Sequence, residues 1–210
     1  MIVAIESAST DISLALARRN GSLLADAGWT SDRRQGHETL PRLLQLLTEA
    51  NGRLADVSAV AVGIGPGSFT GLRVGLSLGK GLALALRVPI LGLPSLRAWL
   101  DAEPDAEAAI GRAGAREAYL LLRADAEPRI VDREELPAGV HDHVVVAPAE
   151  LAEALGLRAA RPPYRAAASL AASAARRLAD DPAGDDLARL EPAYLRVPRG
   201  VGQLPHAEAG

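Results

Sequence analysis

The chain has 210 residues, of which 49% are hydrophobic and 23% charged, and its formal net charge is −3. This is the composition of a globular protein, and the slightly negative charge argues against a protein that grips many nucleic-acid phosphates unaided. The sequence contains no cysteine, which excludes disulfides, thiolate metal sites and thiol catalysis. No stretch of about 18 apolar residues is free of charge, so we expect no membrane span and a cytosolic protein.

The start of the chain has the pattern of three antiparallel strands. Residues 2–5 form a short apolar run, and residues 13–18 and 22–29 have the character of two further strands. Arg19-Asn20-Gly21 between the second and third strands is a hairpin signal. A turn of small, hydroxylated residues joins the first two strands. We therefore expect the chain to open with a three-stranded meander.

A leucine pattern then predicts the first helix, near residues 38–51. Pro41 suits the first turn of such a helix, and Asn51-Gly52 suits its end. The leucines recur at i, i+3, i+4 and i+7, which is the spacing of one apolar helix face. They are Leu40, Leu43, Leu44 and Leu47.

Strands and helices alternate through the rest of the first half. We expect a strand at 57–64, a loop at 65–70, a helix at 71–86, a strand at 88–93 and a helix at 95–102. This alternation is typical of an α/β fold.

An acidic, proline-containing stretch at 101–107 predicts a boundary between two lobes. The first lobe would span residues 1–100, and a smaller second lobe would span residues 101–210. We expect the chain to end in a frayed tail from Gly200. The second lobe should hold strands at 118–122 and 144–146 and helices at 148–155 and 166–178.

The helix at 71–86 carries an unusual stripe of small residues. Gly67, Gly71, Gly75, Gly79 and Ala83 recur every four residues, and from Gly71 onward they share one helix face. Each glycine inside a helix costs about 1 kcal/mol relative to alanine. A face without side chains lets another backbone approach closely. We predict that another subunit packs there; the alternative is that the glycines seat the helix on its own sheet.

This hypothesis has consequences for single residues. If the stripe is an interface, Gly75→Leu should abolish pairing and leave the monomer folded. Arg73 and Lys80 are the charged residues of this otherwise apolar helix. They would either pair with charges on the partner at the rim of the interface or extend into solvent along its edge, and the sequence leaves both open.

Other motifs lack the context that their chemistry needs. Gly65, Gly67 and Gly71 are spaced one residue too far apart for a dinucleotide fingerprint, and no serine or threonine follows Lys80 as a P-loop requires. His37-Glu38 begins like a zinc-protease motif, but a proline occupies the second histidine position. We therefore expect no catalytic residue, no metal and no cofactor.

Three stretches together resemble one protein family. They are residues 2–10, residues 62–76 with the Lys80-Gly-Leu-Ala that follows, and residues 191–196. The sequence resembles TsaB, also called YeaZ, the partner subunit of the transferase TsaD in bacterial synthesis of threonylcarbamoyladenosine (t6A) in tRNA. The resemblance implies a two-lobed fold of the actin, Hsp70 and sugar-kinase superfamily, with a reduced second lobe. It also implies a non-catalytic relative of TsaD.

The resemblance further implies the partners. TsaB pairs with TsaD through the helices that correspond here to 38–51 and 71–86, TsaE binds the pair, and TsaB alone forms a homodimer through the same surface. Contact with tRNA would be indirect, through the complex. The expected interface residues are Leu40, Leu43, Leu44, Leu47, Gly71, Leu72, Arg73, Gly75, Leu76, Gly79, Lys80 and Ala83.

One departure from the family affects the first turn. Family members usually have Asp-Thr-Ser where this chain has Glu6-Ser7-Ala8, and in active relatives that aspartate lies in a phosphate loop with a metal. A glutamate is one methylene longer and would misplace the carboxylate. We therefore expect a degenerate phosphate loop made of Glu6, Ser7, Ser9 and Thr10.

Two other functions stay open at this stage. An independent ATPase or small-molecule kinase of the same superfamily would need a working carboxylate after the first strand and a second acidic phosphate loop. A peptidase, a label the wider family has carried, would need metal ligands or a nucleophile–base pair. The sequence shows neither set clearly.

Overall fold

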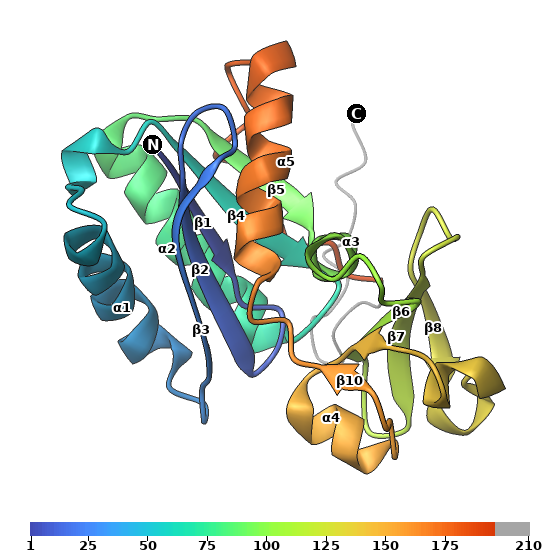
Figure 1. The fold of residues 1–210 in the computed structure, drawn as a ribbon. Coiled ribbons are helices and arrows are strands. Elements are labelled where there is room, and N and C mark those ends of the chain that lie inside the picture. The colour runs from blue at the N-terminus through green and yellow to red at the C-terminus, as the bar shows by residue number, and fades with distance from the viewer. Residues whose placement is uncertain (196–210) are drawn as a thin grey trace, which may run out of the picture.

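The computed structural model describes residues 1–195 and contains two five-stranded sheets (Figure 1). The first sheet has the strand order β3-β2-β1-β4-β5, and the second has the order β10-β9-β6-β7-β8. The α/β class expected from the alternating pattern is confirmed. The predicted frayed tail, and Arg196 of the third family stretch, lie outside the described residues.

The first sheet begins with the predicted meander. Strand β1 pairs antiparallel with β2, β2 pairs antiparallel with β3, and β4 and β5 continue the sheet in parallel with β1. The elements of this half are β1 (Ile2–Glu6), β2 (Asp11–Ala17), β3 (Leu23–Thr30), α1 (Gln35–Glu49), β4 (Ala59–Gly65), α2 (Phe69–Leu86), β5 (Ile90–Pro94) and α3 (Ser95–Ala102).

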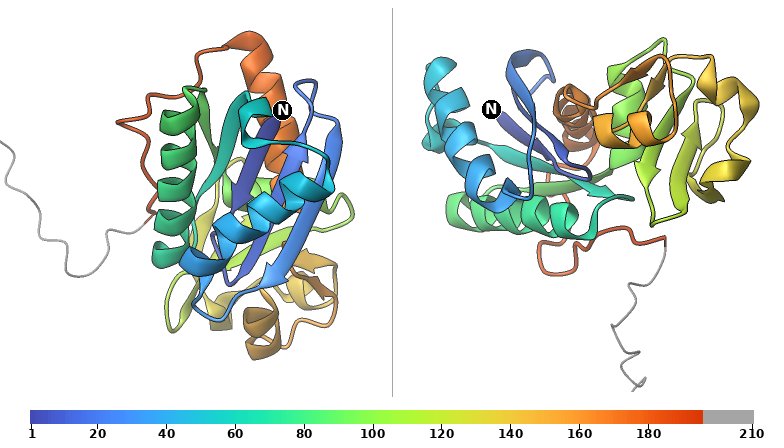
Figure 2. Two further views of the ribbon diagram at one scale, coloured as in Figure 1. Left: turned by 90° about the vertical axis from the view of Figure 1, so that its left-hand side faces the viewer. Right: turned by 90° about the horizontal axis from the view of Figure 1, so that it is seen from below.

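Helices cover both faces of the first sheet, as Figures 1 and 2 show. Every residue of β1 and β2 is buried, because alternate side chains meet different helices. Side chains such as Val3 and Val60 pack with α1 and α2 on one face. Ile2 and Ala61 pack with Leu170 of α5 (Ala166–Asp180) on the other face.

The second sheet follows α3 and has short strands. Its strand β6 was not predicted, because it directly follows the acidic stretch that marks the predicted boundary. The elements are β6 (Ala108–Arg112), β7 (Glu117–Leu122), β8 (Arg129–Asp132), β9 (Val145–Val146), α4 (Ala149–Ala154) and β10 (Ala160–Arg161). The predicted division at residue 100 stays a prediction; α5, from the second half of the chain, packs on the first sheet.

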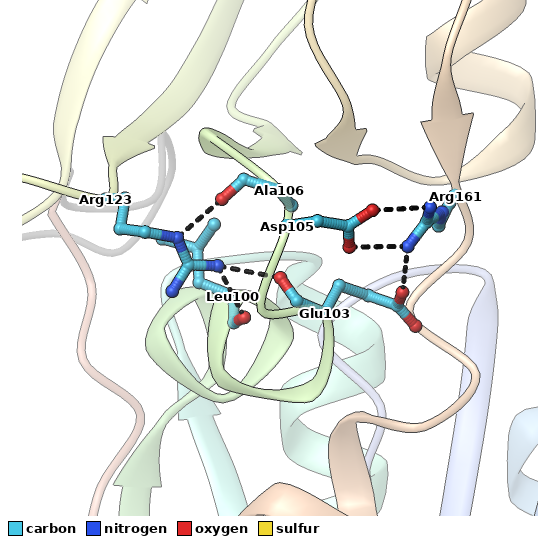
Figure 3. A network of polar contacts seen from close by, with 6 residues as sticks. All are labelled: Leu100, Glu103, Asp105, Ala106, Arg123 and Arg161. Carbon is cyan, nitrogen blue, oxygen red and sulfur yellow. Dashed lines mark hydrogen bonds and ion pairs between the residues drawn. The ribbon is translucent and has the colours of Figure 1, made fainter.

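Arginines hold the segment that connects α3 to the second sheet (Figure 3). The guanidinium group of Arg123 donates hydrogen bonds to the carbonyl oxygens of Ala106 (2.6 Å), Leu100 (2.9 Å) and Glu103 (2.7 Å). Arg161 of β10 donates to both carboxylate oxygens of Asp105, each at 2.7 Å. The Leu100 and Glu103 carbonyl oxygens also accept the backbone amides of Glu103 (3.1 Å) and Ala106 (3.0 Å), so Arg123 adds a second donor to each of them.

The first helix starts earlier than predicted. Helix α1 begins at Gln35, so Pro41 lies inside it instead of in its first turn. A proline has no amide hydrogen, so the carbonyl oxygen of His37 loses its helical donor. Asn51 has a φ of 55°, in the left-handed region, which agrees with the predicted end of this helix.

Candidate partner interface

Helices α1 and α2 lie side by side on the same face of the first sheet (Figure 2). Each has a buried side and an exposed side. The buried residues of α2 are Gly71, Leu72, Gly75, Leu76, Gly79 and Ala83.

The glycine stripe faces the chain's own sheet. A Cβ atom on Gly71 would lie 2.0 Å from the carbonyl oxygen of Ser7, and one on Gly75 would lie 2.1 Å from the Ser7 hydroxyl oxygen. A Cβ on Gly79 would lie 2.3 Å from a methyl carbon of Val62. The glycines therefore let α2 settle directly on β1 and β4, and the hypothesis that they leave room for a foreign backbone is wrong.

Helix α1 shows the same division of its leucines. Leu43 and Leu47 are buried in the core beneath the helix, whereas Leu40 and Leu44 are 38% and 41% exposed. Eight of the twelve predicted interface residues are thus buried within the chain. The four that reach the surface at least in part are Leu40, Leu44, Arg73 and Lys80.

Helix α2 has a second stripe of small residues, and this one faces solvent. Ser77, Gly81 and Ala85 are exposed and four residues apart. A Cβ atom on Gly81 would have no neighbour within 4 Å. The spacing of these residues is visible in the sequence, but the interface was predicted on the stripe of four glycines, which lies on the opposite side of the helix. We call the exposed residues Leu40, Leu44, Phe69, Arg73, Ser77, Gly81 and Leu84 the outer face.

The end of the described chain borders this outer face. The Nε atom of Arg73 donates to the Tyr194 hydroxyl (3.3 Å), and its guanidinium carbon lies 3.9 Å from the centre of the Phe69 ring. Lys80 Nζ donates to the carbonyl oxygen of Ala188 (3.4 Å). Both cations of α2 therefore have partners within the chain, an arrangement that neither sequence interpretation included.

The predicted degenerate phosphate loop is split between two environments. Glu6 is fully buried, and its Oε1 accepts the amide hydrogen of Ala8 (2.7 Å). Its Oε2 has no hydrogen-bond partner among the described residues and lies 2.0 Å from the position that a Cβ on Gly63 would take. Burial raises the pKa of Glu6 to about 7, because an apolar interior disfavours the ionised carboxylate.

The hydroxyl groups of the loop also point in different directions. Ser7 is buried and donates a hydrogen bond to the carbonyl oxygen of Gly71 (2.9 Å). Ser9 and Thr10, in contrast, line a cleft of about 370 Å³ between the two halves of the chain. The structure therefore separates the Glu6 carboxyl from the part of the loop that a ligand can reach.

The described residues hold no cluster of three or more potential metal ligands. Helix α2 is long and apolar enough to cross a membrane by length and composition. One of its faces packs on the first sheet, however, as in the core helix of a water-soluble domain.

Comparisons with known proteins find similarity to TsaD and TsaB proteins. The model of the TsaD family, tRNA N6-adenosine threonylcarbamoyltransferase, matches residues 32–131. The TsaB protein of Escherichia coli, named for tRNA threonylcarbamoyladenosine biosynthesis, is 37% identical over 95 residues, which are 45% of this chain and 40% of the relative. A TsaD of Solidesulfovibrio magneticus is 46% identical over 93 residues, which are 44% of this chain and 24% of that protein.

The structural comparison extends over nearly the whole chain. YeaZ from Pseudomonas aeruginosa superimposes with a TM-score of 0.70 at 23% identity, covering 92% of this chain and 99% of that one. The resemblance to the TsaB family is confirmed. The sequence matches to the curated TsaB and TsaD relatives span less than half of those proteins, so the similarity to TsaB outside the first half rests on the fold.

Proposed function

We propose that this chain is a non-catalytic subunit of a t6A-modifying assembly, which binds and supports a TsaD-type transferase through the outer face of α1 and α2. The main support for the proposal is that the outer face exposes apolar and small residues. It includes the exposed leucines Leu40, Leu44 and Leu84, the last at 67% exposure, and the open surface at Gly81. Apolar and small residues on one exposed face are typical of a surface that packs against another helix.

The match to TsaD supports this choice of partner. The residues matched by the TsaD family, 32–131, include the whole of α1 and α2. Two homologous proteins that carry the same helix pair can pack those helices against each other around a pseudo-twofold axis. The same geometry would allow two copies of this chain to pair when TsaD is absent. TsaE would bind the TsaD pair, and contact with tRNA would be made through the complex, in the cytoplasm.

The burial of Glu6 supports a role without chemistry. An independent ATPase or kinase of this fold would need a carboxylate at the end of β1 that faces the cleft. Here that carboxyl is enclosed beside Gly63 and bonded to the turn that follows it. Because the carboxyl cannot reach a ligand in the cleft, we expect no ATP turnover by the isolated chain.

The experiment is a binding measurement with the cognate TsaD. We expect Leu44→Arg to weaken the complex at least tenfold, because a charge replaces an exposed leucine of the outer face. The matched control is Leu24→Arg on β3, since Leu24 is also exposed, at 39%, and it is its neighbour Ala25, not Leu24, that packs into the core shared with α1. Mass in solution by light scattering and affinity by calorimetry report the result. Equal affinities for the two variants would refute the outer face as the binding surface.

A further inference from the structure

Helix α2 carries cations along one edge and contains no acidic residue. Its charged side chains are Arg73 and Lys80, and Arg87 caps its C-terminal end. The three residues follow one another at intervals of seven, so they lie on nearly one line of the helix, about 10 Å apart. We call them the cationic edge. Because Arg73 belongs to the outer face, the cationic edge borders the surface that we propose for the partner.

The end of the described chain runs beside α2 and orients two of these cations (Figure 2). The Tyr194 hydroxyl accepts the Nε hydrogen of Arg73 at 3.3 Å, and the guanidinium carbon lies 3.9 Å from the centre of the Phe69 ring. The carbonyl oxygen of Ala188 accepts from Lys80 Nζ at 3.4 Å. These partners are all neutral, so they fix the side chains in place without compensating their charge.

No ion pair between described residues neutralises the cationic edge. The segment beside α2 carries Asp185 and Asp186, but these pair with Arg177 and Arg189. Glu191 of the same segment is exposed and forms no ion pair with a described residue. The edge therefore presents uncompensated positive charge to solvent.

The carboxylates of α1 are engaged close to their own helix. Glu38 accepts the indole hydrogen of Trp29 at 3.0 Å and pairs with Arg34 at 3.7 Å, and Glu49 accepts the side-chain amide of Gln45 at 2.8 Å. Neither helix of the outer face offers an unengaged carboxylate. A second copy of this chain would bring the same cations and the same engaged carboxylates to the contact.

We propose that the cationic edge selects an acidic partner: it receives carboxylates of a TsaD-type protein and disfavours pairing of the outer face with a second copy of this chain. The inference rests on the proposed function. Charges that flank a helical contact set partner choice in coiled coils, because like charges repel in one pairing and opposite charges attract in the other. The guanidinium group of Arg73 uses only its Nε in the chain, so its planar fork can bind a carboxylate through parallel hydrogen bonds.

An RNA backbone also attracts cations, but two observations favour a protein as the partner. The cationic edge lies among exposed apolar side chains, since Phe69 is 37% and Leu84 67% exposed, and arginine beside aromatic and apolar groups is typical of protein interfaces. The chain as a whole has a net charge of −3, whereas proteins that grip a nucleic-acid backbone are usually basic.

The test measures two equilibria of the full chain, its complex with the cognate TsaD and its self-association, at about 50 and about 500 mM sodium chloride. Salt screens attraction and repulsion alike, so the two equilibria should respond in opposite directions. We expect the complex with TsaD to weaken about tenfold at the higher salt concentration. Self-association should be weaker at low salt than at high salt, or absent at both. Self-association that is tighter at low salt, or a complex indifferent to salt, would overturn the proposal.

Single charge removals on α2 test the edge itself. Arg73→Gln should weaken the complex with TsaD about fivefold at low salt, less at high salt, and should not weaken self-association. Lys80→Gln provides a second removal, and circular dichroism verifies that each variant is folded. The matched control, Arg158→Gln, removes an 85% exposed arginine of the second half, and it should bind TsaD like the wild type.

The outcomes separate this inference from the proposed function. If Leu44→Arg abolishes the complex while Arg73→Gln and the salt series leave it unchanged, the outer face binds TsaD and the electrostatic selection is wrong. If the wild type forms no complex with TsaD at either salt concentration, the proposed function fails as well. Binding of labelled tRNA to the isolated chain that Arg73→Gln abolishes, with unchanged affinity for TsaD, would assign the edge to RNA and overturn the proposal.

Discussion

The hydroxyl group of Ser7 donates a 2.9 Å hydrogen bond to the carbonyl oxygen of Gly71, and it thereby joins the turn after β1 to the first turn of α2. This contact is possible because no side chain stands between the two backbones. A Cβ on Gly71 would lie 2.0 Å from the Ser7 carbonyl oxygen. The glycine stripe thus serves the internal seating of α2, and the surface available to a partner is the opposite side of the same helix.

The internal seating predicts the effect of Gly75→Leu. A leucine here would place its Cβ 2.1 Å from the Ser7 hydroxyl oxygen, and the rest of the side chain would enter the fully packed space above β1. We expect the free energy of unfolding to fall by about 3 kcal/mol or more, since overpacking of this size moves the backbone. Urea unfolding of the isolated monomer measures it. A folded, wild-type-like monomer that had only lost its partner would restore the original interface hypothesis.

Two glycines two residues apart provide a matched comparison. Gly79→Ala should destabilise the chain by about 1–3 kcal/mol, because the new Cβ would lie 2.3 Å from a Val62 methyl group. Gly81→Ala should stabilise it by about 1 kcal/mol, because alanine has the higher helix propensity and the site is open. The measurement is the urea unfolding midpoint of each variant, compared with that of the wild type. Changes of the same sign in both would mean that α2 is not oriented as described.

The spacing of small residues in α2 predicted part of the structure of this helix and its contacts, but not all of it. Spacing identifies the residues that share a helix face, so the stripe of Gly71, Gly75 and Gly79 was found correctly. Spacing does not identify what covers that face, so the choice between a partner and the chain's own sheet was wrong. The contact of Tyr194 with Phe69, whose ring centres lie 5.6 Å apart, joins segments distant in sequence, and no local pattern predicts it.

The turn after β1 was likewise predicted only in part, because local sequence does not show which distant residues pack against it. The sequence identified Glu6 as a departure from the family pattern and predicted a misplaced carboxylate. It could not show that the carboxyl would be fully buried beside Ser95, because Gly63 and Ser95 come from later elements of the chain. The cleft was also invisible, because Arg33, Gln35 and Arg112 meet there only after both sheets have formed.

Glu6 makes stability depend on pH. Burial raises its pKa from 4.5 to about 7 in the folded chain, so the folded state binds the proton more tightly than the unfolded state. The stability that this proton provides is complete below pH 4.5, falls as pH rises to about 7, and is absent above that. Glu6→Gln, which keeps the shape and removes the titration, should therefore be more stable than the wild type at pH 8, by up to about 3 kcal/mol.

The measurement is urea unfolding of both proteins between pH 4.5 and 8. The difference between them isolates Glu6 from the other titrating groups, which they share. We expect the two stabilities to diverge as pH increases. Parallel curves over the whole range would show that Glu6 titrates normally and is not enclosed as described.

Arg123 should matter more than Arg161, although both bind the segment between α3 and β6 (Figure 3). Arg123 donates to three backbone carbonyl oxygens, at Leu100, Glu103 and Ala106, and thereby joins the end of α3 to the segment that follows it. Arg161 is 44% exposed and binds carboxylates that water can solvate in its absence. We expect Arg123→Met to cost about 1–3 kcal/mol of unfolding free energy and Arg161→Met less than about 1 kcal/mol. Urea unfolding ranks the two variants, and faster proteolysis at residues 101–107 in Arg123→Met alone would locate the effect. Equal losses in the two variants would contradict the prediction, because the exposed ion pairs would then contribute as much as the carbonyl contacts.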